Sequence, residues 1–379
     1  GLVHAVSRCF DVPAQLLRAA PAAGVAAPWH RYLAGVLRQL PEAPPRLGAR
    51  LLIAGDLPAT GGLSSSSSLT MGLLGGLNAL WQLGLSPTEL VARGIVAERH
   101  VGVESGGMDQ TVITMGRRGA ALHIAFAPPA RRIVPLPAGL RLVAAFSGEE
   151  APKGGAVQQA YNERVIGCRL AAALLARRLG CSAGQPPVLG AVVQAAGRAS
   201  GDAAGEALAA LAALVAQLPR LASASAVAGQ LGQEVEPLVA LTAGRAEAER
   251  PVLVRPVAHH VLGEASRVAL AEAALRAGDL AGFGRLLDAS HRSLAEDFRC
   301  STPALDRLCD ALRRAGARGA RLTGAGFGGY ALAALAPEHE PVVLAAARAA
   351  TGGPAFAVTA SDGLSVERLD QGGEERTRR

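Results

Sequence analysis

The sequence predicts a protein that mixes helices with strands and divides into two or three domains. Three observations support this. Strand-like and helical stretches alternate as far as about residue 150, helical patterns dominate from Tyr161 onward, and a strand followed by glycines returns at residues 320–334. The chain has 379 residues, of which 50% are hydrophobic, so each domain can bury an ample core.

The charge balance favours a small anionic substrate. The formal net charge is +7 and comes almost wholly from arginine, which suits a ligand such as a nucleotide. Nucleic acid is a poor fit, because the arginines are scattered and aromatic residues make up only 3% of the chain. We therefore expect no nucleic-acid partner.

The cysteine pattern and the hydropathy indicate a soluble cytoplasmic protein. The five cysteines are scattered without a Cys-x-x-Cys pair, which suits a reducing compartment and argues against a disulfide framework or a zinc site. The chain shows neither a signal-peptide-like run nor an apolar stretch of about 18 residues without charge or proline, so we expect no membrane partner.

The elements before residue 102 follow from apolar spacing and helix caps. Tyr32 is expected on the same helix side as Leu33 and Val36. Ser86 to Glu89 form a capping box with proline at the first helical position. In chain order we expect a strand at Leu2–Ala5, a helix at Trp29–Leu40, a strand at Leu51–Ala54, a helix over 69–83 and another from Pro87 to about Val101.

The rest of the chain is expected to begin with strands and continue with helices. Alternating residues with proline turns predict antiparallel strands over 118–150, the last of them at Leu140–Phe146. A final strand is expected at Ala355–Thr359. The helices expected between these strands are Arg164–Arg178, 203–218, Val261–Arg276, Phe283–Phe298 and Leu305–Ala315.

The stretch Pro58–Ser68 predicts a phosphate-binding loop between a strand and a helix. Its glycines let the backbone approach a ligand, its serines can cap the helix, and the first helical turn attracts anions. It is not a Walker loop, which needs Gly-Lys-Ser/Thr, because Lys153 is the only lysine in the chain. The alternative is a flexible Gly/Ser linker.

Two acidic residues and one glycine run stand out. Glu98 falls in the last turn of a helix, where the dipole disfavours it, so it indicates either a metal ligand or a surface salt bridge. Asp109 follows two glycines and either meets a substrate hydroxyl or stabilises a turn. The run Gly324–Gly329 indicates either a dinucleotide fingerprint or a tight turn between strand and helix, close to another backbone.

Taken together and in this order, these stretches resemble the GHMP small-molecule kinases, specifically their galactokinase and N-acetylgalactosamine kinase branch. The resemblance covers nearly the whole chain. The form Gly-Gly-Met-Asp-Gln and the stretch that begins at Asn162 are similar to the N-acetylgalactosamine kinase side. The matching motifs are Pro58–Ser68, Gly106–Gln110, His259–Arg267, Ala289–His291, Ser301–Asp306 and Leu322–Gly329.

The resemblance implies an α+β fold of two domains with the site in the cleft between them. Residues 1–150 would form an N-terminal mixed-sheet domain, and residues 151–379 a ferredoxin-like C-terminal domain with helical insertions. It also implies a monomeric enzyme that transfers a phosphoryl group from ATP, with Mg²⁺, to the anomeric hydroxyl of galactose or a similar sugar.

The resemblance further assigns roles to individual residues. Ser66 and Glu98 would hold Mg²⁺. Asp109 would be the catalytic base, and Gly106, Asp109 and Tyr161 would contact the sugar. Gly324–Gly329 would bring backbone close to the site. The residues expected to wrap the ATP phosphates are Thr60, Gly61, Gly62, Leu63, Ser64, Ser65 and Ser66.

The sequence also departs from the family pattern. Thr60 stands where the family often has glycine, and Tyr330 replaces a common cysteine. The first family motif, Gly-Arg-Val-Asn-Leu-Ile-Gly-Glu-His-Thr-Asp-Tyr, supplies an arginine that assists Asp109 and groups that read the sugar. Since the sequence starts at Gly1 without it, we expect the motif either to precede this residue in a longer protein or to have been lost.

These departures leave two hypotheses of different classes. One is an ATP-dependent sugar 1-kinase, which the presence of Ser66, Glu98 and Asp109 favours. The other is a kinase-like protein that binds ATP and sugar without turnover, as a sensor or a relic. A serine hydrolase is excluded as a reading of Ser64–Ser68, because the chain has no Gly-x-Ser-x-Gly elbow there.

Overall fold

The computed structural model describes residues 2–8, 13–17, 21, 25–44, 46–58, 62–102, 106–126, 129–150, 155–200, 211–239 and 245–369. They fall into two compact units. The first contains the described residues of 1–56, 66–117 and 361–379, and the second those of 57–65 and 118–360. Each unit is described by itself below. The domain bounds expected from the sequence, 1–150 and 151–379, stay predictions.

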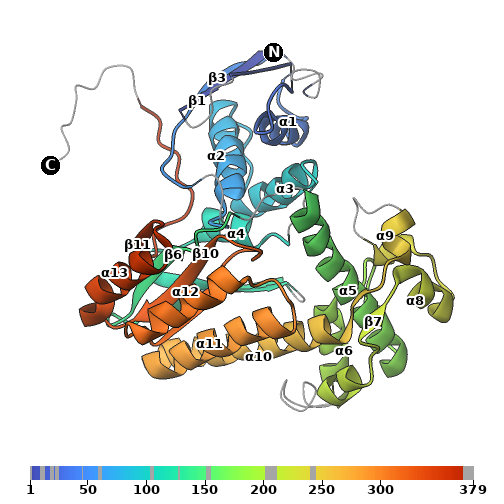
Figure 1. Cartoon of the computed structure of the whole chain (residues 1–379). Helices are drawn as coiled ribbons and strands as arrows, with labels where there is room; N and C mark the ends of the chain where they lie inside the picture. The colour runs from blue at the N-terminus through green and yellow to red at the C-terminus, as the bar shows by residue number, and fades with distance from the viewer. Residues whose placement is uncertain are drawn as a thin grey trace. The chain divides into compact units, whose positions relative to one another are not determined.

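The first unit contains a mixed three-stranded sheet (Figure 1). Its central strand β1 (Leu2–Ser7) pairs antiparallel with β2 (Ala14–Leu17) and parallel with β3 (Ala49–Ile53). Side chains alternate along β1, so that Val3 and Ala5 are fully buried whereas Leu2 is 50% exposed. The sheet therefore has one core face, against which helices pack.

Four helices complete the first unit: α1 (His30–Arg38), α2 (Ser65–Leu80), α3 (Pro87–Arg99) and α4 (Met108–Met115). Their apolar faces and the core face of the sheet share one hydrophobic core. The expected capping box is confirmed at the start of α3. The Ser86 hydroxyl accepts from the Glu89 N–H at 3.3 Å, and the Glu89 carboxylate accepts from the Ser86 N–H at 2.8 Å.

The second unit is built on an antiparallel four-stranded sheet in the order β11-β6-β10-β9. One face packs on α12 (Pro303–Arg314) and α13 (Glu340–Thr351). The other face packs on α10, on α11 and on a β4–β5 hairpin. The remaining bounds are β4 (Ala120–Phe126), β5 (Pro129–Pro135), β6 (Arg141–Phe146), β9 (Gly319–Leu322), β10 (Tyr330–Leu335), β11 (Ala355–Val358), α10 (Arg255–Ala277) and α11 (Leu280–Glu296).

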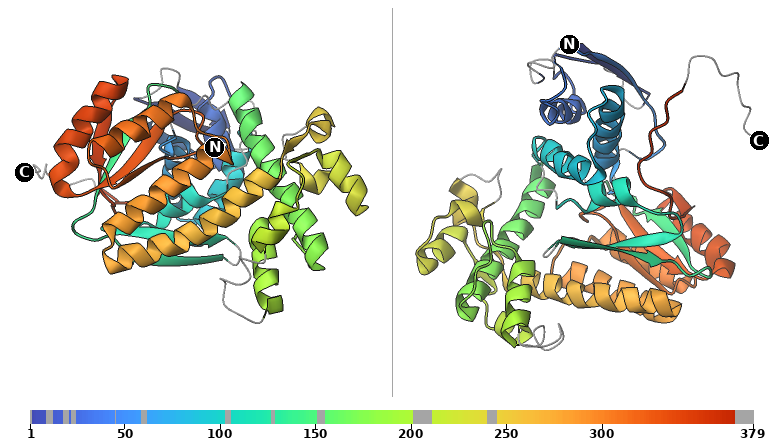
Figure 2. Two further views of the ribbon diagram at one scale, coloured as in Figure 1. Left: turned by 60° about the horizontal axis from the view of Figure 1, so that its bottom comes forward. Right: turned by 180° about the vertical axis from the view of Figure 1, so that it is seen from behind.

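A helical part with its own core extends the second unit (Figure 2). Its long helix α5 (Gly155–Leu179) contributes a continuous buried run from Leu170 to Ala176. Gly167 lets α5 approach β8, because a Cβ there would collide with the carbonyl oxygen of Leu253. The other elements are α6 (Leu189–Ser200), a helical stretch at 211–216, α8 (Ala224–Leu231), α9 (Arg245–Glu249), β7 (Leu221–Ala222) and β8 (Val252–Leu253).

Most of the expected elements are confirmed, with shifted ends. The helix expected over 69–83 begins at Ser65, because the serines fall in its first turn. The helix expected from Val261 begins at Arg255, because Pro256 is compatible with a first helical turn. Residues 203–210 of another expected helix lie outside the described residues. The expected strands 118–150 are antiparallel, but β6 joins a different sheet from β4 and β5.

The interpretation of the glycine run was wrong in one respect. The run joins β9 to β10, two antiparallel neighbours, so it is a strand-to-strand turn and neither a dinucleotide fingerprint nor a strand-to-helix turn. Its closeness to other backbone is confirmed below. The mixture of helices and sheets confirms the α+β class. Across the ranges that the structure describes, no helix has both the length and the apolar character needed to cross a membrane.

Candidate active site

The expected phosphate loop is a sharp turn into α2. Thr60 and Gly61 lie outside the described residues, and the description resumes at Gly62. Gly62 and Ser64 have φ angles of +82° and +57°, both in the left-handed region. Ser65 then opens the 16-residue helix α2, so the positive end of the helix dipole lies at this turn. Ser65–Ser68 are part of this helix, so the described serines there do not form a flexible linker.

The glycine run of the second unit lies against this loop. A Cβ on Gly324 would come within 2.7 Å of the Gly62 carbonyl oxygen, and a Cβ on Gly62 within 3.3 Å of the Thr323 carbonyl oxygen. Gly324 has a φ of +74°, a conformation that favours glycine. Both positions therefore need glycine for shape, and the two backbones meet directly.

Ser66 and Glu98 lie together around Tyr32 in the first unit. Burial raises the pKa of the Tyr32 hydroxyl, the negative charge of Glu98 raises it further, and a hydrogen bond with Ser66 partly offsets both. The three residues come from α2, α3 and α1 respectively. Glu98 is only 5% exposed, so the alternative of a surface salt bridge does not describe it.

Close helix packing produces this arrangement. A Cβ on Gly35 of α1 would come within 2.5 Å of the Ala97 carbonyl oxygen in α3. A Cβ on Gly94 of α3 would collide with the sulfur of Met71 in α2. The two glycines allow the three helices to approach, which places the end of α3 beside the start of α2. The carboxylate of Glu98 can then lie near the phenol of Tyr32 instead of facing solvent.

Asp109 lies in the first turn of α4. The helix begins after Gly107, whose φ is +90° and whose added Cβ would lie 2.5 Å from Cδ1 of Ile95. The Thr111 hydroxyl donates to the Gly107 carbonyl at 2.7 Å and holds the turn. Asp109 is half-buried and Gly106 is exposed. A carboxylate thus stands at the positive end of a helix dipole, next to an accessible backbone position.

Tyr161 belongs to the second unit and lies half-buried on α5. One turn further along, Arg164 donates from Nε to the Phe298 carbonyl at 2.6 Å, and its guanidinium lies 5.9 Å from the centre of the Phe327 ring. These contacts tie α5 to the glycine run. The structure therefore brings Ser66 and Glu98 together in the first unit, whereas Gly62–Ser65 and Tyr161 belong to the second.

Sequence reasoning missed Tyr32 as a site residue. Its position among apolar residues of α1 made it look like part of the core, although its hydroxyl contacts Ser66 and it is only half-buried. A phenol on an otherwise apolar helix side, shortly before Gly35, was the available signal. The partner residues are 34 and 66 positions away in the chain, so no local pattern could show them.

The side-chain oxygens of Ser66 and Glu98 fit a magnesium ion whose other ligands come mainly from a bound nucleotide and water. Carboxylate and hydroxyl oxygens are hard donors, and Mg²⁺ in nucleotide sites takes one or two protein ligands besides phosphate oxygens and water. Glu98 and the Ser66 hydroxyl match that description. Among the described residues, no group of three or more His, Cys, Asp or Glu side chains forms a cluster suited to a metal.

Comparison with known families matches both parts of the chain. Residues 31–117 match the model of the GHMP kinases N terminal domain, and residues 271–353 match that of the GHMP kinases C terminal domain. The first match spans Tyr32, Ser66, Glu98 and Asp109. The second spans the glycine run and the strands β9 and β10 that flank it.

Individual relatives point to one branch. The chain is 33% identical to a galactokinase of Chloroflexus aurantiacus, over 84% of this chain and 69% of that one. It is 31% identical to a galactokinase of Lacticaseibacillus casei, over 80% of this chain and 66% of that one. The structure of Lactococcus lactis galactokinase complexed with galactose matches with a TM-score of 0.69 and 26% identity, over 97% of this chain and 84% of that one. The chain belongs to the GHMP kinases, in their galactokinase branch, and so to the sugar-kinase phosphotransferases.

Proposed function

We propose that this chain phosphorylates the anomeric hydroxyl of galactose, or of a galactose-like sugar such as N-acetylgalactosamine, with ATP as donor. The observation that carries the proposal is the grouping of Ser66 and Glu98 beside the start of α2, with Asp109 at the start of α4. The relatives named galactokinase, and the galactose-complexed structure among them, support the choice of sugar.

The phosphates of ATP would lie at the start of α2. Thr60 to Ser66 would surround them, because the start of the helix supplies backbone N–H groups and a positive dipole end while the glycines keep Cβ atoms out of the way. No lysine is needed for this, which suits a chain whose single lysine is Lys153. The Tyr32 hydroxyl, bonded to Ser66, would orient that side chain.

Ser66 and Glu98 would be the protein ligands of Mg²⁺. When bound, the ion would neutralise charge on the phosphate oxygens during transfer. The buried Glu98 carboxylate would supply the negative charge that attracts it, and the Ser66 hydroxyl would supply a neutral oxygen. The helix packing around Gly35 and Gly94 would hold the two groups at a fixed separation.

Asp109 would act as the general base. Its carboxylate would accept the proton of the anomeric hydroxyl as that oxygen bonds to the γ-phosphorus, while the bond from the γ-phosphorus to the ADP oxygen breaks. Gly106 and Tyr161 would contact the sugar and orient it. Correct placement of the hydroxyl matters most, because phosphoryl transfer needs positioning and charge neutralisation more than covalent help. We expect a monomer that acts in the cytoplasm.

An ADP-release assay tests the proposal. It compares galactose, N-acetylgalactosamine and no sugar, for this chain and for a longer version begun at an upstream start codon if the gene encodes one. Sugar-dependent release from either version supports the kinase, and the preferred sugar follows from kcat/KM. ATP binding without release from both versions would instead favour the protein that binds ATP and sugar without turnover.

A further inference from the structure

Strand β9 forms an edge of the four-stranded sheet, with its only strand neighbour in the described sheet being β10. In an antiparallel pair, alternate residues direct both their N–H and C=O groups away from the partner. The Thr323 N–H donates to Tyr330 of β10, so Leu322 and Ala320 direct their groups outward. An edge like this one is exposed to mispairing or fraying unless something covers it.

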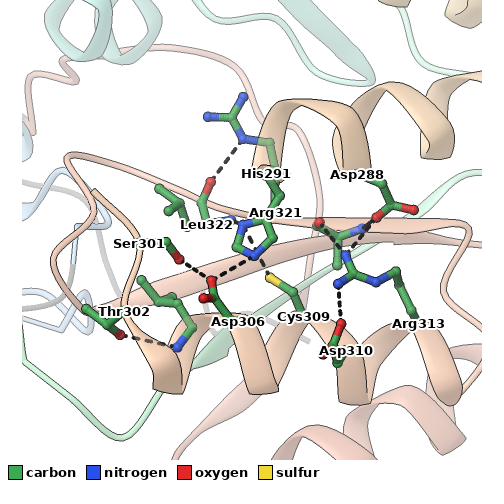
Figure 3. Close-up of polar contacts among 12 residues, drawn as sticks. Asp288, His291, Ser301, Thr302, Asp306, Cys309, Asp310, Arg313, Arg321 and Leu322 are labelled. Atoms are coloured by element: carbon green, nitrogen blue, oxygen red, sulfur yellow. Dashed lines mark hydrogen bonds and ion pairs between the residues drawn. The ribbon is translucent and has the colours of Figure 1, made fainter. Parts of the chain in front are cut away.

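Side chains of α11 satisfy both outward N–H groups (Figure 3). The Ala320 N–H donates to Oδ1 of Asp288 at 2.9 Å, and the Leu322 N–H donates to Nδ1 of His291 at 3.3 Å. Asp288 and His291 are three residues apart on the helix, and so face the same way. The corresponding strand positions are two residues apart, which matches one turn of helix closely enough for both bonds.

The outward carbonyls are satisfied as well. Arg313 donates to the Ala320 carbonyl at 3.3 Å and to Asp288 at 2.9 Å, while Nε of Arg321 donates to the Leu322 carbonyl at 3.0 Å. The last two outward residues of β9 are thus fully bonded through side chains. Because such bonds are directional, they fix the position and the orientation of the end of β9 relative to α11.

His291 accepts the Leu322 N–H as a neutral imidazole. The ring is 5% exposed, and burial lowers its pKa, with Asp306 raising it in part. Since Nδ1 accepts from the Leu322 N–H, the proton of the neutral ring lies on Nε2, which is 3.3 Å from Oδ1 of Asp306. Ser301 donates to the same oxygen at 2.5 Å. Asp306 therefore lies beside the Nε2 side of the ring, and Nδ1 of the ring holds the Leu322 N–H.

The neighbouring thiol could suggest a nucleophile instead. Cys309 lies 3.8 Å from Nδ1 of His291, and with Asp306 the three resemble a Cys-His-Asp triad. However, Cys309 is fully buried, and burial raises the pKa of its thiol to about 12. Reactive cysteines are accessible and have lowered pKa values. The group is therefore structural, and the bond to Leu322 is its distinctive feature.

The strand end matters because the glycine run starts immediately after it. Gly324, Gly326, Phe327, Gly328 and Gly329 all have positive φ angles, so the run has little regular structure to hold it. Gly326 lies against Cys300, and Gly328 against the carbonyls of Glu149 and Glu150. Gly324 meets Gly62 of the phosphate loop. A shift of Leu322 would therefore also move Gly324 relative to Gly62.

We propose that His291 is a positioning residue that anchors the end of β9 through Leu322 and thereby holds the glycine run against Gly62 of the phosphate loop. The part that concerns ATP rests on the proposed function. The part that concerns the strand end does not. His291 touches neither substrate in this scheme, and acts through the backbone of residues 322–324.

Three variants separate the anchoring bond from the other contacts of the ring. His291→Leu removes the polar contacts with Leu322, Asp306 and Cys309. His291→Asn places an amide oxygen near the position of Nδ1 and keeps an acceptor for the Leu322 N–H. His291→Gln extends an amide toward Asp306 and loses that acceptor. Ser293→Ala is the matched control, because Ser293 is buried on the same helix and its hydroxyl bonds with His260 and Asp297.

Two quantities are measured on each variant: amide hydrogen exchange and the Kd values for ATP and sugar. Urea titration gives the free energy of unfolding of each variant, so that a general loss of stability can be separated from a local effect. Amide hydrogen exchange of residues 322–329 should accelerate by about tenfold in His291→Leu and His291→Gln, and should stay near the wild-type rate in His291→Asn and Ser293→Ala. The Kd for ATP should rise by about tenfold in the same two variants, while the Kd for the sugar stays unchanged.

The outcomes distinguish the two proposals. Unchanged exchange in His291→Leu, or equal acceleration in Ser293→Ala, overturns the anchoring role. An unchanged Kd for ATP in a folded His291→Leu protein whose parent binds ATP overturns the other part of the proposal, the link from the strand end to the phosphate loop. Where the parent binds no ATP, the proposed function fails, and the exchange rates alone still decide whether His291 anchors the strand end.

Discussion

Glu98 occupies a position that helix energetics disfavour. A carboxylate in the last turn of a helix faces the negative end of the dipole, at a cost of about 0.3–1 kcal/mol. Here the side chain is also buried, which adds the cost of removing a charge from water. The proposed Mg²⁺ would offset both costs.

Replacement of Glu98 tests this interpretation. Glu98→Gln keeps the shape and removes the charge, so the Mg²⁺ concentration for half-maximal activity should rise by about tenfold or more. Stability without Mg²⁺ should hold or increase, because a buried charge is gone. The exposed Glu367→Gln serves as control for the loss of one negative charge. An unchanged Mg²⁺ titration would remove Glu98 from the metal site.

The glycine run gives a prediction at the scale of one element. Gly324→Ala should weaken ATP binding, because its Cβ would approach the Gly62 carbonyl to 2.7 Å and its φ of +74° is strained for alanine. Gly278→Ala is a close control: its φ is +69°, but no atom lies within 4 Å of an added Cβ. Gly278→Ala should lose about 1 kcal/mol of stability from the strained φ alone, and Gly324→Ala should lose more, because the backbone clash adds to the strain.

The two variants should differ in ligand binding. Calorimetry should find the Kd for ATP raised at least about tenfold in Gly324→Ala and unchanged in Gly278→Ala, since only the first alters the contact with the phosphate loop. Equal ATP affinities in the two proteins would mean that the contact between Gly324 and Gly62 has no part in nucleotide binding.

Local chemistry explains which elements could be predicted. Ser86 to Glu89 carry a complete capping signal, and the structure confirms it atom by atom. The residues after the glycine run, Tyr330–Leu335, form a short apolar stretch that periodicity cannot assign to a strand or a helix. This stretch becomes a strand because it pairs with β6 and β9, and β6 lies far away in the sequence.

At the scale of the whole molecule, the sequence predicts the family but not which distant residues come together. Motif order indicates the family, and the comparisons confirm it. The grouping of Tyr32, Ser66 and Glu98 depends on helix packing through Gly35 and Gly94, which a single sequence does not reveal. The roles of these residues, and of Asp109 and Tyr161, stay predictions. The bonds from α11 to β9 likewise appear only when the two elements are placed together.

Buried histidines should make the stability of the second unit depend on pH. Burial of His260 lowers its pKa to about 4, with Glu264 raising it in part, whereas an unfolded chain has a value of about 6.5. Between these values the unfolded state binds more protons, so the free energy of unfolding falls as pH falls, by up to about 1.4 kcal/mol per pH unit. Above about pH 6.5 this effect vanishes.

Urea unfolding at pH 7.5 and pH 5 measures the effect. His260→Gln, which cannot titrate in this range, should lose less stability between the two pH values than the parent. His4→Gln is the control, because His4 lies in the first unit and is not fully buried. If the parent and His260→Gln lose equal stability, another group causes the pH dependence.

Asp109→Asn in the protein that shows sugar-dependent ADP release tests the central claim most directly, with Glu367→Gln beside it as control. The account predicts that kcat falls by at least about 10²-fold while the Kd for ATP changes by less than about twofold, because the amide keeps its place at the start of α4 but cannot accept the sugar proton. Turnover equal to that of the parent would contradict the assignment of Asp109 as the base.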